Sequence, residues 1–283
     1  MSRYPRTTLR RVAHARALMA AFTSSKTTAA APTRGLRAGR IDRTRLARLG
    51  VGDYKVFTSP LNPKPQRLRV TVLIDGSGSM EAYMNGTYTG SGPKRTEVAQ
   101  QVARDLAEAM TMLPRGTVMG KVYAHGTATA SPIPGRQQGQ MSPSLHSSAD
   151  NMEEGTAVLF PLWQQGEPTE NVDRYSLVRY SGNIDHLALE YVALDLLDEV
   201  NPAREQALII IISDGAPGDQ SMVKMVVDDI RRKGVEVVSV SIAPEKELKE
   251  AQAKMYGAAN VVQYNANVNV MAKEMAKVMG RML

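Results

Sequence analysis

Val70-Thr-Val-Leu-Ile-Asp-Gly-Ser-Gly-Ser-Met80 joins an apolar run directly to a turn of glycines and serines. The first half of this stretch alternates valine and isoleucine with other residues, and Leu73 adds a second apolar face. That pattern is typical of a strand buried on both sides, as in the sheet of an α/β protein. We expect the strand to start near Arg67 and to end at Asp75, where the glycines allow a tight turn.

The turn after this strand carries oxygen donors at alternating positions, Asp75, Ser77 and Ser79. The glycines between them let the backbone fold so that the carboxylate and both hydroxyls face one point. A second acid, Asp214, follows the apolar run Ala207–Ser213. Open parallel sheets bind ligands at the carboxyl ends of their strands, so we expect the two acids to lie together there.

A donor set made of oxygens favours a hard divalent cation, Mg²⁺ or else Mn²⁺ or Ca²⁺. The chain has no cysteine and four scattered histidines, which argues against zinc. The competing interpretation is a turn without a ligand, because Asp, Gly and Ser are ordinary turn residues. The second acid, placed after the next buried strand, favours the metal.

Beyond this turn, segments with helical and strand spacing alternate to the end of the sequence. The expected helices span residues 96–113, 185–200, 220–233, 245–256 and 268–283. The expected further strands span residues 117–124, 208–213, 235–242 and 261–264, with a short antiparallel return at 127–133. This order predicts a three-layer, Rossmann-like α/β domain with a mainly parallel sheet, one antiparallel edge strand and helices on both faces.

The organisation we expect is a basic N-terminal arm and linker with short helices over residues 1–66, followed by the α/β domain over residues 67–283. Within the domain, residues 134–180 are rich in Gly, Pro, Ser and Gln and predict a long irregular insertion. Residues 1–50 hold twelve Lys and Arg and one acid, whereas the rest holds 23 bases and 27 acids. The chain is therefore a mildly acidic body with a basic arm.

Three interpretations of the basic arm stay open. It is a solvated tail, a segment that binds an acidic protein partner, or a nucleic-acid contact. Its aromatic residues are few, which disfavours base stacking. The absence of acids from residues 1–41 is also typical of an organellar transit peptide.

Two of these motifs resemble a known family. Val70–Met80 resembles the first adhesion-site motif of von Willebrand factor A domains, and Ile212–Pro217 resembles the last one. With Ser181-Gly-Asn-Ile-Asp-His-Leu-Ala-Leu189, the sequence is most similar to the C-terminal A domain of cobaltochelatase CobT subunits, over about residues 38–283. The resemblance implies a metal-ion-dependent adhesion site, in which the metal ligands are drawn from Asp75, Ser77, Ser79, Asn183, Asp185 and Asp214.

The middle of the three motifs departs from the common pattern. Most A domains supply a threonine there as a metal ligand, and Asn183 stands in its place. Asp185, two residues on, offers a carboxylate, and either side chain can replace the hydroxyl. Asp185 is also a candidate N-cap of its helix. His186 stands where the CobT pattern has glycine.

The resemblance implies a CobT-like accessory subunit of a bacterial or phage AAA+ ATPase complex of the CobS or MoxR type, as in the metal chelatases of cobalamin biosynthesis. The metal would grip an acidic side chain of a partner protein. The chain lacks the long acidic N-terminal region of full CobT subunits. The alternative is a stand-alone Mg²⁺-dependent protein-binding module whose arm contacts nucleic acid or another acidic surface.

The sequence carries no nucleophile motif and no phosphate loop, so we expect no catalytic machinery of its own. At most the chain would be a non-catalytic subunit of a cobaltochelatase-like complex. No apolar run is long enough to span a membrane, and we expect a cytoplasmic protein.

Overall fold

The computed structural model describes most of the α/β body and three shorter N-terminal pieces. The described residues are 13–20, 22, 34–36, 40–58, 67–127, 157–177, 182–201, 205–215 and 219–282. Within these ranges, no helix is both long and apolar enough to cross a membrane.

Six strands form the central sheet, in the order β6-β5-β4-β7-β8-β9. They are β4 (Arg67–Asp75), β5 (Val118–Thr127), β6 (Ala157–Gln164), β7 (Glu205–Ser213), β8 (Val235–Ser241) and β9 (Val261–Gln263). β6 runs antiparallel to β5 at one edge, and all other neighbours are parallel. The predicted α/β fold with one antiparallel edge strand is confirmed.

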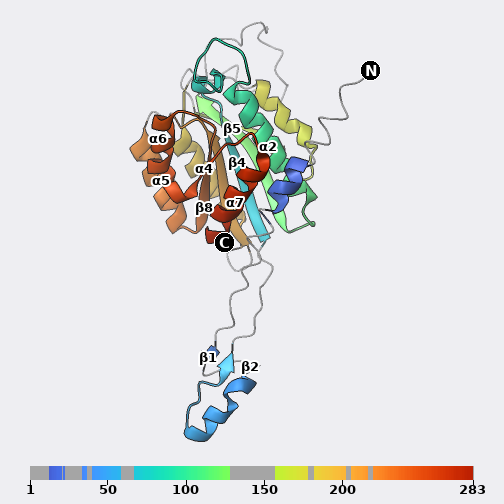
Figure 1. Ribbon diagram of the computed structural model, residues 1–283, viewed down its shortest axis with the longest axis vertical. Helices are drawn as coiled ribbons and strands as arrows, with labels where there is room; N and C mark the ends of the chain where they lie inside the picture. The colour runs from blue at the N-terminus through green and yellow to red at the C-terminus, as the bar shows by residue number, and fades with distance from the viewer. Residues whose placement is uncertain are drawn as a thin grey trace.

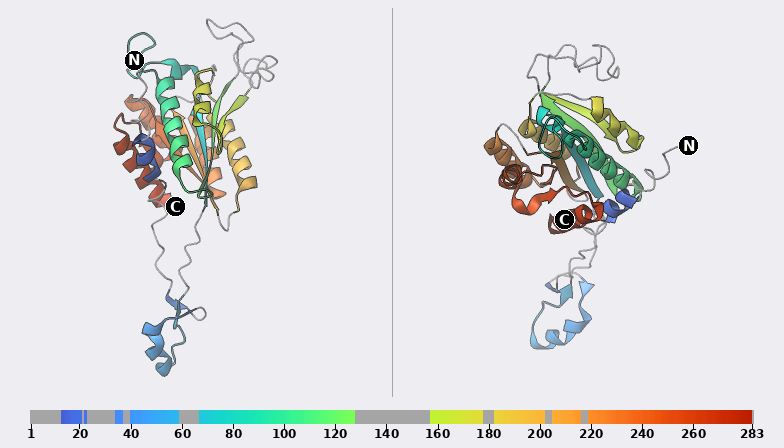
Figure 2. Two further views of the ribbon diagram at one scale, coloured as in Figure 1. Left: turned by 90° about the vertical axis from the view of Figure 1, so that its right-hand side faces the viewer. Right: turned by 45° about the horizontal axis from the view of Figure 1, so that its top comes forward.

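Helices cover both faces of this sheet, as the views in Figure 1 and Figure 2 show. One face is covered by α2 (Arg95–Met112) and α7 (Val268–Met282). The other is covered by α4 (Asp185–Glu199), α5 (Gln220–Arg232) and α6 (Lys246–Tyr256). These bounds agree with the expected helices to within a few residues.

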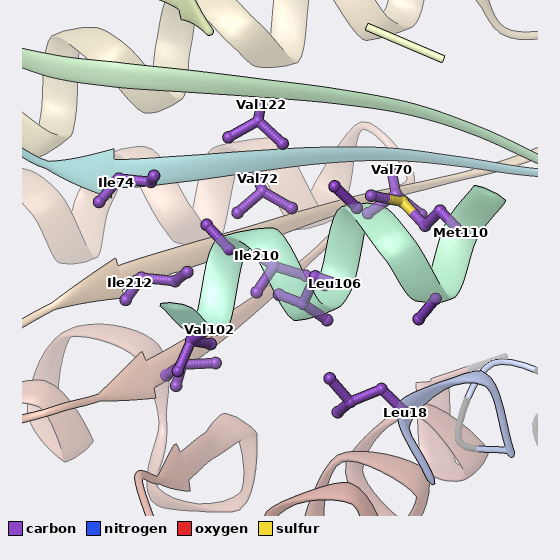
Figure 3. Packing of buried hydrophobic residues seen from close by; sticks show 14 of the residues in the cluster. Leu18, Val70, Val72, Ile74, Val102, Leu106, Met110, Val122, Ile210 and Ile212 are labelled. Carbon is purple, nitrogen blue, oxygen red and sulfur yellow. The ribbon is translucent and has the colours of Figure 1, made fainter. Parts of the chain in front are cut away.

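The alternation along β4 divides the core between the two faces. Val72 and Ile74 pack on the α2 side, whereas Leu73 packs on the α4 side. Figure 3 shows Leu106 of α2 lying against the first group. Burial of apolar surface stabilises the fold by about 25 cal/mol per Å² removed from water. A shift of β4 by one residue would turn each side chain to the opposite face, so the packing on both faces fixes the register of this strand.

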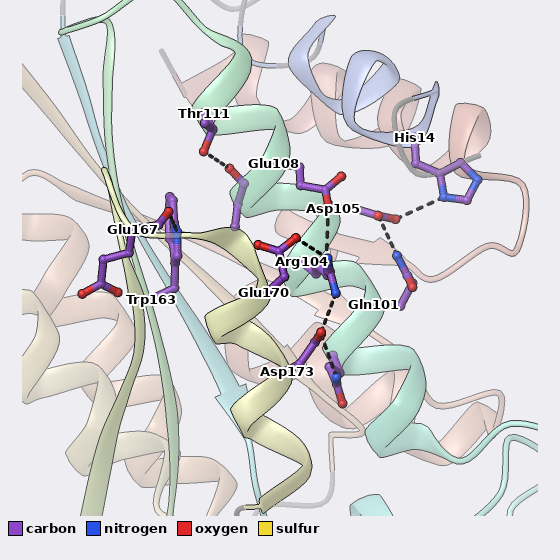
Figure 4. A network of polar contacts seen from close by, with 12 residues as sticks. His14, Gln101, Arg104, Asp105, Glu108, Thr111, Trp163, Glu167, Glu170 and Asp173 are labelled. Atoms are coloured by element: carbon purple, nitrogen blue, oxygen red, sulfur yellow. Dashed lines mark hydrogen bonds and ion pairs between the residues drawn. The ribbon is translucent and has the colours of Figure 1, made fainter. Parts of the chain in front are cut away.

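The antiparallel edge strand is not where the sequence suggested. β5 continues to Thr127, and the return strand is β6, inside the 134–180 segment that was expected to be irregular. That segment also contains η4 (Thr169–Leu177), a 3₁₀ helix that Arg104 of α2 ties down through Glu170 and Asp173 (Figure 4). The expected return at 127–133 and the rest of the insertion fall mostly on residues 128–156, outside the described residues.

Residues 13–20 form a helix that packs on the same face as α2 and α7. Ala15, Leu18 and Phe22 are buried there, each at most 1% exposed. His14 Nδ1 lies 3.2 Å from a carboxylate oxygen of Asp105 in α2 (Figure 4). Part of the segment expected to be an arm therefore contributes to the core.

A small separate unit follows. Its three strands, β1 (Arg34–Leu36), β3 (Phe57–Thr58) and β2 (Arg40–Ile41), form an antiparallel sheet. η2 (Arg43–Val51) is a short helix of the kind expected over residues 1–66. In Figure 1 the unit lies beyond the end of the central sheet at which β4 begins. Several of its large apolar side chains are exposed: Ile41, Leu46, Leu49, Val51 and Tyr54.

Candidate metal centre

The two acids singled out in the sequence lie at the carboxyl ends of neighbouring strands. β4 and β7 pair in parallel with Ile74 opposite Ile212, so Asp75, the last residue of β4, is level with Ser213, and Asp214 follows directly after β7. Both carboxylates are fully buried. The expectation that the strand order brings these two acids together is confirmed.

Asp75 is held by neutral donors. Its Oδ1 accepts from the backbone N–H of Ser77 at 2.8 Å, and its Oδ2 accepts from Asn183 Nδ2 at 2.9 Å and Ser213 Oγ at 3.2 Å. Burial, and after it the negative charge of Asp214, together raise the pKa of Asp75 to about 7. The unfavourable charge of this carboxylate is a reason for a cation to bind here.

The hydroxyls of Ser77 and Ser79 are hydrogen-bonded to each other, with their oxygens 3.0 Å apart. Neighbouring oxygens of an octahedral Mg²⁺ shell, each about 2.1 Å from the ion, lie about 3.0 Å apart. The serine pair therefore already has the spacing of one edge of that shell. η3 (Gly78–Glu81) begins directly after Ser77 and holds the spacing.

The two candidate ligands of the middle motif, Asn183 and Asp185, make different contacts. Asn183 donates to Asp75 and accepts the backbone N–H of Asp185 at 2.9 Å, so its amide joins the site to the start of α4. Asp185 is fully buried, and its Oδ2 accepts from the hydroxyl of Tyr256 at 3.1 Å. Asn183 therefore contacts the Asp75 carboxylate, whereas Asp185 is engaged with α6.

His125, in β5, lies beside Asp185. The His125 Nε2 and Asp185 Oδ1 atoms are 3.4 Å apart without hydrogen-bond geometry. Burial lowers the pKa of His125 to about 3 and raises the pKa of Asp185 well above its ordinary value, with the charge of Asp75 as a second cause for Asp185. Both shifts have the direction expected for two groups that burial keeps uncharged, so we treat this contact as neutral rather than as an ion pair.

Arg95 brings a cation to Asp214, which the sequence did not suggest. Its Nη1 donates to Asp214 Oδ2 at 2.8 Å, and its Nη2 contacts Glu245. No spacing rule marks this arginine, because it lies far from both motifs in the chain. Its place as the first residue of α2, right after the polar loop, is the available signal.

The donor set fits a hard divalent cation and depends on hydroxyls. Among the described residues, no three carboxylate or imidazole groups converge as a metal cluster. The two serine oxygens, the Asp75 and Asp214 carboxylates and water supply oxygen ligands of the kind that Mg²⁺ and Mn²⁺ accept. Such a shell keeps several waters, which leaves room for an oxygen from outside the chain.

Comparison with known proteins agrees with this architecture. The family model described as von Willebrand factor type A domain matches residues 70–277. No curated protein matches the chain.

Similar solved structures are distant in sequence. The manganese-loaded TRAP protein of Plasmodium vivax is 14% identical with a TM-score of 0.46, over 74% of this chain and 72% of that one. An aerotolerance-related membrane protein of Bacteroides fragilis is 13% identical with a TM-score of 0.49, over 76% and 99%. The PilB minor pilin of Streptococcus sanguinis is 10% identical with a TM-score of 0.48, over 80% and 63%.

Proposed function

The chain belongs to the von Willebrand factor type A family, and we propose that it binds a divalent cation, Mg²⁺ in the first place, through which it grips an acidic side chain of a protein partner. The observation that carries the proposal is the serine pair, whose oxygens are 3.0 Å apart beside two buried acids. When bound, the cation supplies a positive charge with an open coordination position for the partner's carboxylate.

The chain's own residues would divide the work. Ser77 and Ser79 offer hydroxyl oxygens as direct ligands, because the two oxygens are 3.0 Å apart. Ser79 is partly exposed, whereas Ser77 is buried. Asp75 and Asp214 supply the negative charge, either directly or through bound water. Two hydrogen bonds fix the orientation of the Asp75 carboxylate: one from the Asn183 side-chain amide and one, at 2.8 Å, from the backbone N–H of Ser77.

The partner we propose is an AAA+ ATPase of the CobS or MoxR type, with this chain as its accessory subunit. The support is the resemblance of Ser181–Leu189 to the CobT branch, together with the contacts that Asn183 and Asp185 of this motif make. Asn183 reaches the metal site while Asp185 starts α4 and binds Tyr256. A shift of α4 on partner binding would therefore move a contact of Asp75.

A second candidate function is a stand-alone module whose basic unit contacts an acidic surface. The observation in its favour is η2, on which Arg43, Arg45 and Arg48 accompany apolar side chains that are 41–82% exposed. Exposed apolar groups rimmed by charge are typical of interaction sites. Nucleic acid or an acidic protein would suit this charge.

The test measures Mn²⁺ affinity and partner capture on the same protein. We expect wild-type protein to bind Mn²⁺ and to retain the co-expressed ATPase in Mg²⁺ but not in EDTA, and Asp75→Asn to lose both. Asp53→Asn, in the small unit, is the control acid and should keep both. If Asp75→Asn binds Mn²⁺ like wild type, the proposed site is wrong.

The same preparation separates the two candidates. Binding through the basic unit should survive EDTA and weaken steeply with salt, because it releases counterions. Binding through the metal should vanish in EDTA.

A further inference from the structure

Arg95 places a buried positive charge inside the candidate metal centre. Its side chain is 5% exposed, and its Nη1 donates to Asp214 Oδ2 at 2.8 Å. Its Nη2 contacts Glu245, whose side chain is 30% exposed. Arg95 thus bridges a buried candidate ligand and an acid that solvent reaches.

Three elements and one loop hold this bridge. Asp214 follows β7, Arg95 begins α2, and Glu245 is the N-cap of α6. The backbone N–H of Arg95 donates to Ala82 O at 2.9 Å, which ties it to the loop that follows the serines. Gly86 in that loop has a φ of +82°, and a Cβ there would meet Glu245. The bridge is therefore part of the packed structure.

Of the two buried acids, Asp214 contacts Arg95, whereas Asp75 is held by other donors. The donors to Asp75 are neutral, and burial with the charge of Asp214 raises its pKa. Asp214 instead has a guanidinium. A divalent cation held by the serines and by Asp214 must share this carboxylate with Arg95, and two cations on one carboxylate repel each other. Burial strengthens that repulsion, because little water screens it.

We propose that Arg95 is a positioning residue that sets the affinity of the site for its divalent cation, an inference that rests on the proposed metal-binding function. Arg95 keeps Asp214 aimed and weakens metal binding by competing for it. Glu245 draws part of the guanidinium charge away from Asp214. A partner that contacts Glu245 or the loop over residues 82–94 would then change the metal affinity without touching the metal.

Two variants at opposite ends of the bridge test this with Mn²⁺ as the probe, on the full chain. Arg95→Gln should bind Mn²⁺ about tenfold more tightly or better, since one nearby charge shifts an ionisation equilibrium by about that factor or more. Glu245→Gln should bind it about threefold more weakly or worse, because Arg95 is left to Asp214. Misfolding would weaken both, so shifts of opposite sign support the proposal.

Lys94→Gln and Glu81→Gln are the matched controls. They remove the same two charges from the neighbouring ion pair, whose Nζ and Oε2 atoms are 2.9 Å apart. Control shifts smaller than those of the bridge variants support the specific role. Equal shifts would show that overall charge sets the affinity and would overturn the assignment to Arg95.

Melting in EDTA separates this role from a merely structural one. Arg95→Gln should melt below wild type, because Asp214 is left buried without its cation, and it should gain more from Mn²⁺. A lower melting temperature with unchanged or weaker Mn²⁺ affinity overturns the inference alone. A wild-type chain that binds no Mn²⁺ overturns the proposed function and this inference together.

Discussion

Asp75 is a carboxylate whose ionisation falls in the physiological range. Burial and the negative charge of Asp214 together raise its pKa to about 7. A cation needs the ionised form, so a proton and the metal compete for this group. The residue alone therefore couples metal binding to pH.

Mn²⁺ affinity should fall about tenfold for each pH unit below 7 and level off above it, because one proton must leave Asp75 for each ion bound. Titrations of wild-type protein from pH 5.5 to 8.5 measure this. Asp75→Asn, which should lose Mn²⁺ binding, should show no such slope at any of these pH values. An affinity for wild type that stays flat through pH 7 would contradict the assignment.

His125 predicts a separate loss of stability in acid. Its folded pKa of about 3 lies below its ordinary value because burial disfavours the charged ring. The unfolded chain therefore binds the proton first, and the contribution to stability is lost as pH falls from about 6.5 towards 3. The loss by pH 5 is about 2 kcal/mol. Other groups, Asp75 among them, also titrate in this range, so the test is the difference between two proteins. The stability of wild type relative to His125→Leu, measured in urea, should fall by about 2 kcal/mol from pH 7 to 5; parallel profiles would rule this out.

The site residues differ in how far the sequence could reveal them. Asp75, Ser77, Ser79 and Asp214 follow buried strands, and strand order places such residues at one edge of a parallel sheet. The sequence does not decide between Asn183 and Asp185, since the choice depends on which side chain turns towards Asp75. Arg95 was missed, because its contact with Asp214 forms only when α2 and β7 are packed together.

At the scale of elements, a hydrogen bond near the site joins α4 to α6. Tyr256 ends α6, and its hydroxyl donates to Asp185 at the start of α4. Both side chains are fully buried. The bond therefore satisfies one oxygen of a carboxyl group that water cannot reach.

Tyr256→Phe should lower the free energy of unfolding by about 1–3 kcal/mol, because it leaves a buried acceptor without its donor. Urea denaturation followed by the fluorescence of Trp163 measures the change. Tyr191→Phe is the control: Tyr191 lies on α4 with its side chain 65% exposed, and the substitution should change the free energy of unfolding little. Equal stabilities for wild type and Tyr256→Phe would show that the bond does not hold the two helices.

Most strands and helices were predicted to within a few residues because their apolar spacing is regular. β6 was not, since Pro161 interrupts its pattern and the strand follows a stretch rich in Gly, Ser and Pro. Proline is compatible with an edge strand, where its missing N–H faces away from the sheet. Local pattern could not show that β5 would provide the one neighbour this strand needs.

At the scale of the whole molecule, the charge of the N-terminal segment concealed a structural role. The basic residues suggested a tail, whereas Ala15, Leu18 and Phe22 share one helix face and are buried. Their spacing was a helical signal, but it could not indicate which surface would receive the helix. That surface is assembled from α2, α7 and the sheet.

Leu18→Ala should lower the free energy of unfolding by about 2–4 kcal/mol, because it leaves a cavity in the packed core. Leu46→Ala, on a side chain 42% exposed in η2, should change it by less than about 0.5 kcal/mol. Urea denaturation of both variants gives the comparison. Equal small effects would mean that the N-terminal helix contributes no stability to the domain.

The place of residues 13–22 has a consequence for synthesis on the ribosome. Ala13 and His14 line a cavity together with Val268 and Asn269 at the start of α7, and α7 packs in the same core cluster as Leu18. The helix at residues 13–20 therefore cannot complete its packing until α7, near the end of the chain, has left the ribosome. Until then the apolar face of this helix is exposed to solvent, and a ribosome-associated chaperone could bind it.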